Sequence, residues 1–171
     1  MKNLLWLIRW FVGLLFIFSG LIKVNDPVGL SYKMQEFFEV WGLHGFNDYT
    51  LFLSVAMNSF EVLAGVAIII GWKMEWFSWL LLLLIIFFTF LTGYALFSGK
   101  IKTCGCFGDC IPLTAAQSFY KDLILLVLIL FLVVYQKKIN ASLPIGWSVA
   151  IVAASLILSV MAQLHVLKHL P

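Results

Sequence analysis

The chain has 171 residues and a mean hydropathy of +1.06; 63% of its residues are hydrophobic and only 11% are charged, against about 25% charged in a soluble domain. This composition excludes a soluble globular domain and indicates an integral membrane protein. The net charge of +3 is small and its cations are scattered, so a nucleic-acid-binding protein is not indicated either.

Five apolar stretches are long enough to cross a bilayer, which takes about 20 helical residues. The first could be mistaken for a signal peptide, but Arg9 interrupts it and no small-residue cleavage site follows, so we expect a retained helix. The last stretch has a lower hydropathy but carries no charged residue, and we expect it to span the membrane as well. The sequence therefore predicts an all-α membrane protein with spans at residues 4–22, 51–72, 76–97, 115–135 and 145–164.

Residues 28–41, between the first two spans, have the pattern of an amphipathic helix. Lys33, Glu36 and Glu39 fall on one side and apolar residues on the other, which is typical of a helix in the membrane interface. We interpret it either as a shelf over the membrane helices or as a surface anchor without chemistry. Its apolar positions are Leu30, Met34, Phe37, Phe38 and Trp41.

Five spans place the termini on opposite faces, and they place residues 23–50 on the same face as the segment between the third and fourth spans. Lys73, Lys137 and Lys138 lie in the short loops of the other face, which favours a cytoplasmic N-terminus by the positive-inside rule. We expect an inner-membrane protein whose third interspan segment faces the non-cytoplasmic compartment, where disulfides persist.

Two spans carry ionisable side chains in their interiors. Glu61 lies about ten residues into the second span, near the midplane, where a charge costs roughly 2.5–3.5 kcal/mol. We predict that it pairs with Arg9 of the antiparallel first span. The pair would be either a proton or quinone site or a structural lock between the two spans. Lys23 and Asp122, near the ends of their spans, are interpreted as interfacial side chains.

All three cysteines lie in residues 103–114, TCGCFGDCIPLT, between the third and fourth spans. Thiol exchange needs an attacking thiolate and a second sulfur close enough to resolve the mixed disulfide. Cys104 and Cys106 are separated by one glycine, and Cys110 offers either sulfur an alternative partner. The segment therefore suggests a thiol/disulfide exchange site.

Other chemistry is open to the same cysteines. With His44, from a loop on the same face, they make a Cys₃His set for zinc, although the single-residue spacing is tighter than usual. An iron–sulfur cluster would want a fourth cysteine, and the chain has three. A structural disulfide with one spare thiol is the remaining alternative. Thiol/disulfide exchange is the hypothesis that the cysteine spacing favours.

The sequence around these cysteines and in the first two spans resembles that of a known family. The CGCFGDC stretch from Cys104 to Cys110, followed by Asp122 in the next span, is similar to the MauE branch of DoxX-like membrane proteins. The likeness covers about residues 5–135. The first two spans look like the DoxX-like signature at spaced charged and small residues, namely Arg9, Gly13, Phe16, Gly20, Lys23, Asp26, Pro27, Glu61, Gly65 and Gly71.

The resemblance implies a four-helix membrane bundle within residues 1–140, which leaves residues 141–171 as an additional C-terminal transmembrane helix. It also implies a role in forming or maintaining disulfides in exported proteins, often alongside a thioredoxin-like partner. Cys104 and Cys106 carry over as the redox pair, and Cys110 is a further candidate.

Two other functions are compatible with this resemblance. DoxX proper implies a small membrane subunit of a quinone-linked oxidoreductase, with Arg9 and Glu61 as the quinone or proton site. A quinone is the one cofactor that the membrane location suggests. The other function is that of a non-catalytic subunit that anchors a larger envelope complex.

Overall fold

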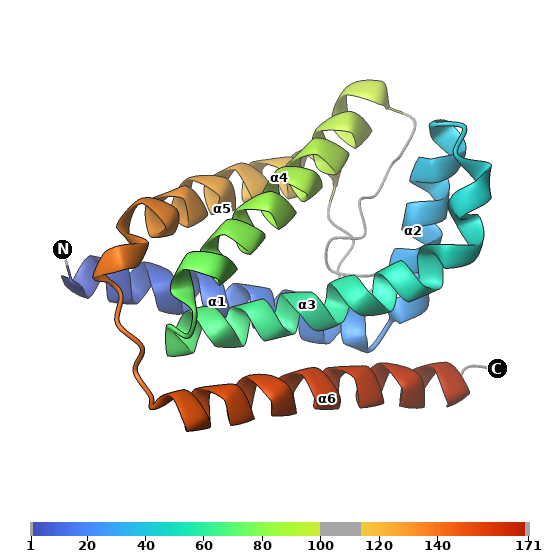
Figure 1. The fold of residues 1–171 in the computed structure, drawn as a ribbon. Helices are drawn as coiled ribbons and strands as arrows, with labels where there is room; N and C mark the ends of the chain where they lie inside the picture. The colour runs from blue at the N-terminus through green and yellow to red at the C-terminus, as the bar shows by residue number, and fades with distance from the viewer. Residues whose placement is uncertain (1, 100–113, 170–171) are drawn as a thin grey trace.

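The computed structural model describes residues 2–99 and 114–169, and the elements in these two ranges are all helices (Figure 1). Five of them are long, and the shorter α2 is set at an angle to its neighbours. The elements are α1 (Lys2–Val24), α2 (Pro27–Val40), η1 (His44–Tyr49), α3 (Thr50–Ile70), α4 (Met74–Ser98), α5 (Ala115–Tyr135), η2 (Gln136–Lys138) and α6 (Ile145–His169).

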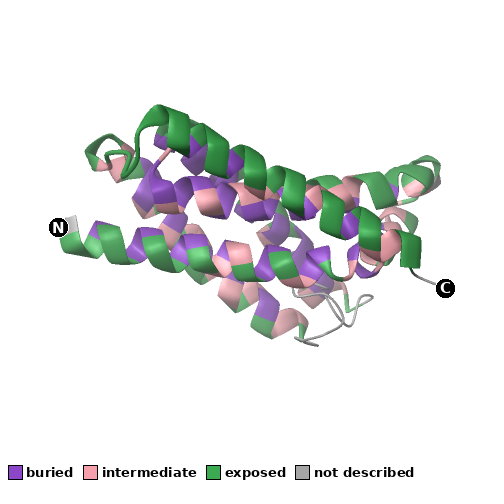
Figure 2. Ribbon diagram, turned by 90° about the horizontal axis from the view of Figure 1, so that it is seen from below, coloured by how far each residue is buried: buried purple, intermediate pink, exposed green. Residues whose placement is uncertain are grey.

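Within residues 2–99 and 114–169, five helical segments are long and apolar enough to cross a membrane, which confirms the prediction of an all-α protein with five such segments. Their buried positions face one another, whereas exposed positions cover the outside (Figure 2). Many of the exposed side chains are large and apolar, as a lipid-facing surface requires. The segments are Asn3–Val24, Gly45–Ile70, Met74–Ser98, Ala115–Lys138 and Ile145–His169.

The long helices form three layers (Figure 1). α1 and α3 lie together in the middle, the α4–α5 pair covers one side of them, and α6 covers the other side. α1, α3, α4 and α5 share one apolar core, to which each contributes a fully buried residue: Val12, Ile68, Leu81 and Ile129. α6 packs mainly on α3 and contributes one buried residue, Val152, to this core.

α1 and α3 approach each other at glycines. A Cβ atom added to Gly65 would lie 2.7 Å from the carbonyl oxygen of Gly13, and one added to Gly13 would lie 2.9 Å from the carbonyl oxygen of Gly65. Such backbone contact between membrane helices is open only to very small residues. It fixes the register in which the polar side chains of α1 meet those of α3.

Gly65→Ala is expected to lower the stability of the protein by about 1–3 kcal/mol, because the new methyl group overlaps backbone atoms that cannot yield without separating α1 from α3. Gly146→Ala is the matched control, since a Cβ at this exposed position in the first turn of α6 meets nothing within 4 Å. Thermal unfolding in detergent measures both variants. Equal unfolding temperatures would contradict the close contact.

α2 begins where an Asp-Pro pair ends α1. The Asp26 carboxylate accepts a hydrogen bond from the Gly29 amide at 2.9 Å, and Pro27 occupies the first helical turn, where its missing N–H costs nothing. The predicted apolar face is buried in its centre, at Leu30, Met34 and Phe37. The amphipathic helix is therefore confirmed, at Pro27–Val40. Its place in a membrane interface stays a prediction.

α6 is attached to α3 through polar side chains. The Gln163 side chain is fully buried; its Nε2 donates to Ser59 Oγ at 2.8 Å, and its Oε1 accepts from Asn58 Nδ2 at 3.2 Å. Hydrogen bonds of this kind hold membrane helices together where hydrophobic attraction between them is weak. They fix α6 against the outer side of α3.

Candidate functional site

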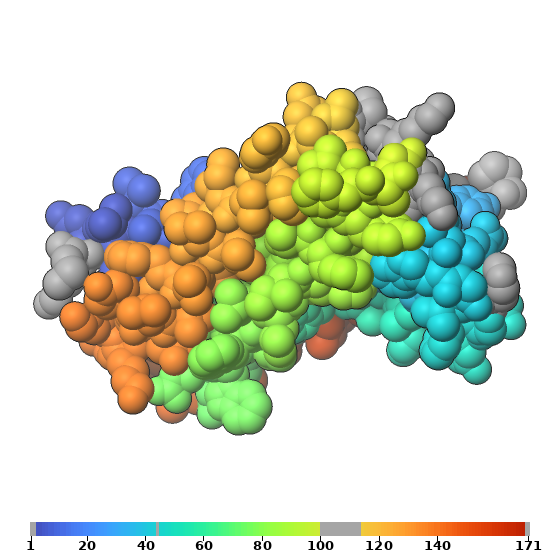
Figure 3. Space-filling view, turned by 90° about the horizontal axis from the view of Figure 1, so that it is seen from above, coloured from blue at the N-terminus to red at the C-terminus, as the bar shows by residue number. Residues whose placement is uncertain are grey.

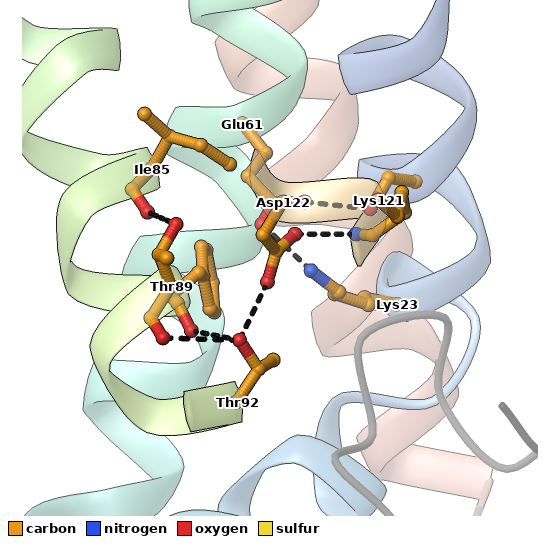
Figure 4. A network of polar contacts seen from close by, with 9 residues as sticks. Lys23, Glu61, Ile85, Thr89, Thr92, Lys121 and Asp122 are labelled. Atoms are coloured by element: carbon orange, nitrogen blue, oxygen red, sulfur yellow. Dashed lines mark hydrogen bonds and ion pairs between the residues drawn. The ribbon is translucent and has the colours of Figure 1, made fainter. Parts of the chain in front are cut away.

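The centre of α3 and the end of α1 meet in a buried ion pair. Lys23 Nζ lies 2.6 Å from Glu61 Oε1, and both side chains are 2% exposed. Ser19, one turn earlier on α1, donates its hydroxyl to Glu61 Oε2 at 3.3 Å. The Lys23 ammonium also lies 4.8 Å from the centre of the Phe88 ring of α4. The Glu61 carboxylate is thus neutralised by a cation that is itself enclosed by three helices (Figure 4).

The predicted Arg9–Glu61 pair is wrong. The Arg9 guanidinium donates instead to Ser142 Oγ at 3.0 Å and to the Asn140 carbonyl oxygen at 3.5 Å, both in the connection between α5 and α6. Arg9 and Lys23 are fourteen residues apart on α1, which is about 21 Å of helix. The antiparallel register puts Arg9 beside the end of α3 and leaves Glu61 within reach of Lys23.

The interfacial interpretation of Lys23 is also wrong, because its side chain is buried between α1, α3 and α4. Asn58 of α3 donates its side-chain amide to the Lys23 carbonyl oxygen at 3.1 Å, and Ser54 donates its hydroxyl to the Pro27 carbonyl oxygen at 2.6 Å. The two bonds hold α3 against the turn between α1 and α2, one at the last turn of α1 and one at the first turn of α2. The Lys23 side chain therefore turns inward to a carboxylate instead of outward to water.

A second pair lies on the facing helices. Asp122 of α5 is 1% exposed; its Oδ2 accepts from Thr92 Oγ1 of α4 at 3.1 Å, and its Oδ1 lies 2.9 Å from Lys121 Nζ. The interfacial interpretation of Asp122 is thus wrong as well. Lys121, whose side chain is 23% exposed, connects this pair to the outside. Figure 4 shows both acidic side chains directed toward the same space between the helices.

The two pairs border one enclosed cavity of about 20 Å³, with Ser19 on its wall. We call Ser19, Lys23, Glu61, Thr92, Lys121 and Asp122 the buried ionic cluster. Its two cations and two anions sum to no net charge. A cavity of this size holds about one water molecule. A quinone ring does not fit this space.

Cys104, Cys106 and Cys110 lie outside the described residues, but the helix ends on either side of their segment are described. α4 ends at Ser98, and α5 is capped by Thr114, which accepts from the Gln117 amide at 3.3 Å. By helix rise, Thr92 is about 11 Å before Gly99 and Asp122 about 12 Å after Thr114. The cysteine segment thus leaves and rejoins the helices about two turns from the buried ionic cluster.

The described part of the chain contains no group of three or more metal-ligating side chains. The zinc hypothesis draws its cysteines from residues 103–114, so it stays an alternative. His165 and His169, in the last two turns of α6, are exposed side chains.

The fold and the cluster define a class of protein: a multi-pass helical membrane protein with charged groups buried between its helices. Residues 1–135, which end with α5, match the family model described as methylamine utilisation protein MauE, and the chain belongs to this family. The predicted MauE resemblance is confirmed, and α6 lies beyond the matched residues. Comparisons with curated proteins and with solved structures give no significant match.

Proposed function

We propose that this MauE-family protein is a membrane thiol/disulfide redox protein that exchanges disulfides with exported proteins through Cys104 and Cys106. The observation that supports it most is the arrangement at the ends of α4 and α5. The Thr92–Asp122 hydrogen bond ties the two helices together about two turns from the cysteine segment. A redox pair needs a rigid support of this kind, because the sulfurs must stay within bonding reach through both oxidation states.

The exchange balances without a further reactant. A partner thiolate attacks one sulfur of the Cys104–Cys106 disulfide, which breaks that bond and forms a mixed disulfide. The second thiolate of the partner then attacks the partner's sulfur in the mixed disulfide. This step forms a disulfide within the partner and releases Cys104 and Cys106 as a reduced pair. Two electrons and two protons pass from the partner to Cys104 and Cys106, and the same steps in reverse reduce the partner.

The proposal includes a location and a partner. A cytoplasmic N-terminus, favoured by Lys73, Lys137 and Lys138, puts the cysteines on the oxidising side of the inner membrane. A thioredoxin-like or other exported thiol protein would reach them there. We also propose that α1, α3, α4 and α5 form the DoxX-like four-helix bundle, on the strength of their shared apolar core.

Within this function we assign Glu61 a proton role. The cavity beside it has room for water but not for a quinone ring, and Arg9 lies at the other end of α1. Asp122 and the partly exposed Lys121 extend the buried ionic cluster toward the outside. Thr92 and Asp122 lie about two helical turns from the ends of the cysteine segment, so a proton role for this cluster accords with a thiol reaction better than a quinone site formed by Arg9 and Glu61 does.

Differential alkylation tests the proposal. Purified protein is titrated with a dithiol reductant, alkylated at each step and weighed by mass spectrometry. We expect two cysteines to become labelled together under mild reduction, and Cys110→Ser, the control, to keep this two-cysteine step. Resistance to ordinary reductant strength would favour a structural disulfide. Thiols that react only after a chelator removes zinc would favour the metal site.

A further inference from the structure

Arg9 is a buried cation without a counter-charge. Arg9 is 7% exposed, and none of the ion pairs among the described residues includes it. The guanidinium has five N–H donors, of which the structure engages two, with Asn140 and Ser142, and its Nε is left buried without a hydrogen-bond partner. Buried charges in proteins are normally paired with an opposite charge. The site therefore has the electrostatics of an anion-binding site.

A pocket of about 210 Å³ opens beside Arg9. The start of α1 and the end of α5 lie side by side at this end of the molecule (Figure 3). The walls of the pocket are the first turns of α1 and the segment just after α5, from Lys138 of η2 to Asn140. Of the described residues that line it, two are cationic and none carries a carboxylate. Its lining is Leu5, Trp6, Arg9, Lys138, Ile139 and Asn140.

The pocket lies where two transmembrane segments reach the edge of the apolar layer. One segment begins at Asn3, and another ends at Lys138. Trp6 is 57% exposed and stacks near Trp10, with ring centres 5.7 Å apart, in the manner of the aromatic belt at a lipid–water interface. An occupant at this level meets lipid headgroups on one side and acyl chains on the other.

We propose that Arg9 and Lys138 bind the phosphate of an anionic glycerophospholipid. The phosphate oxygens accept hydrogen bonds from the free guanidinium N–H groups and from the Lys138 ammonium, while Leu5 and Trp6 contact the adjoining lipid carbons. A zwitterionic choline lipid carries the same phosphate, but its quaternary ammonium is repelled by the two cations. A free phosphate ion would gain nothing from the apolar wall. The site is separate from the buried ionic cluster and independent of the thiol chemistry.

Native mass spectrometry of the full-length protein with added lipid tests this site. Phosphatidylglycerol and phosphatidylcholine with identical acyl chains are compared, and we expect preferential retention of phosphatidylglycerol. Lys138→Gln should reduce that preference about fivefold, the value for one interfacial cation, and Arg9→Gln should reduce it at least as much. Lys168→Gln, which removes an exposed cation in the last turn of α6, is the control and should leave the preference unchanged.

Lys138→Gln is the decisive variant, because Lys138 is exposed and its loss does not threaten folding, whereas Arg9 also holds the connection between α5 and α6. Two results would overturn the proposal: equal retention of the two lipids by the unmodified protein, or an unchanged preference in Lys138→Gln. A third arm adds inorganic phosphate alone. Displacement of the lipid by phosphate at millimolar concentration would assign the site to the free ion and refute the lipid.

Discussion

Glu61→Gln is expected to destabilise the protein by about 3–5 kcal/mol, because it leaves the Lys23 ammonium buried without an opposite charge. Glutamine has nearly the shape of glutamate and can still accept from Ser19, so the loss reports the charge and not a cavity. Lys23 has no route to water in its present position, since its side chain is 2% exposed. Unfolding in detergent, followed by helical circular dichroism, measures the effect.

Glu36→Gln is the matched control for this substitution. Glu36 pairs with Lys33 at 2.9 Å, but the two side chains are 38% and 21% exposed, and such a pair is worth at most about 1 kcal/mol. The double substitution of Lys23 and Glu61 by methionine should recover much of the stability, because it removes both buried charges at once. A Glu61→Gln protein as stable as Glu36→Gln would show that the buried pair is not ionised.

The transmembrane helices could be predicted closely from the sequence. The predicted span 115–135 coincides with α5, and the predicted span 76–97 lies within α4, Met74–Ser98. Long apolar runs determine these helices directly, because every backbone group in a bilayer must bond within its own helix. The ends of these helices could be predicted from local signals, namely a charged residue, a glycine or a capping threonine.

The pairing of the charged side chains could not be predicted in the same way. It depends on the register between α1 and α3 and on the burial of the Lys23 side chain against α3 and α4, neither of which is a local property. A signal was nevertheless present, since Gly13, Gly20 and Lys23 are spaced by seven and three residues and so share one face of α1. The glycines contact α3, and Lys23 follows them toward Glu61.

The burial of Asp122 and Gln163 is a second feature that the sequence did not predict. Near the end of a span, an aspartate next to a lysine is normally solvated, and only the tertiary contact with Thr92 of α4 reveals that Asp122 is buried. Gln163 is the one side-chain amide in the apolar sequence of α6, and its burial against Asn58 and Ser59 follows the general tendency of isolated polar residues to join membrane helices.

Cys106→Ser is expected to abolish net disulfide exchange, because the remaining Cys104 has lost the neighbouring thiol with which it closes the catalytic disulfide. Cys110→Ser is the control and should retain exchange. A quinone-linked oxidoreductase subunit would behave differently, because the protein with all three cysteines changed to serine would stay active. A non-catalytic anchoring subunit would also tolerate the loss of the three cysteines, but it would have no oxidoreductase activity and would co-purify stably with its complex.

The mixed disulfide itself is the most direct measurement. Cys106→Ser protein is expressed in its membrane, thiols are quenched with acid, and covalent adducts are separated without reductant and mapped by mass spectrometry. We predict an exported thiol protein joined to Cys104, released by reductant and absent when Cys104 is also replaced by serine. If neither Cys106→Ser nor the reciprocal Cys104→Ser protein forms an adduct while the unmodified protein remains functional, the proposed thiol exchange is contradicted.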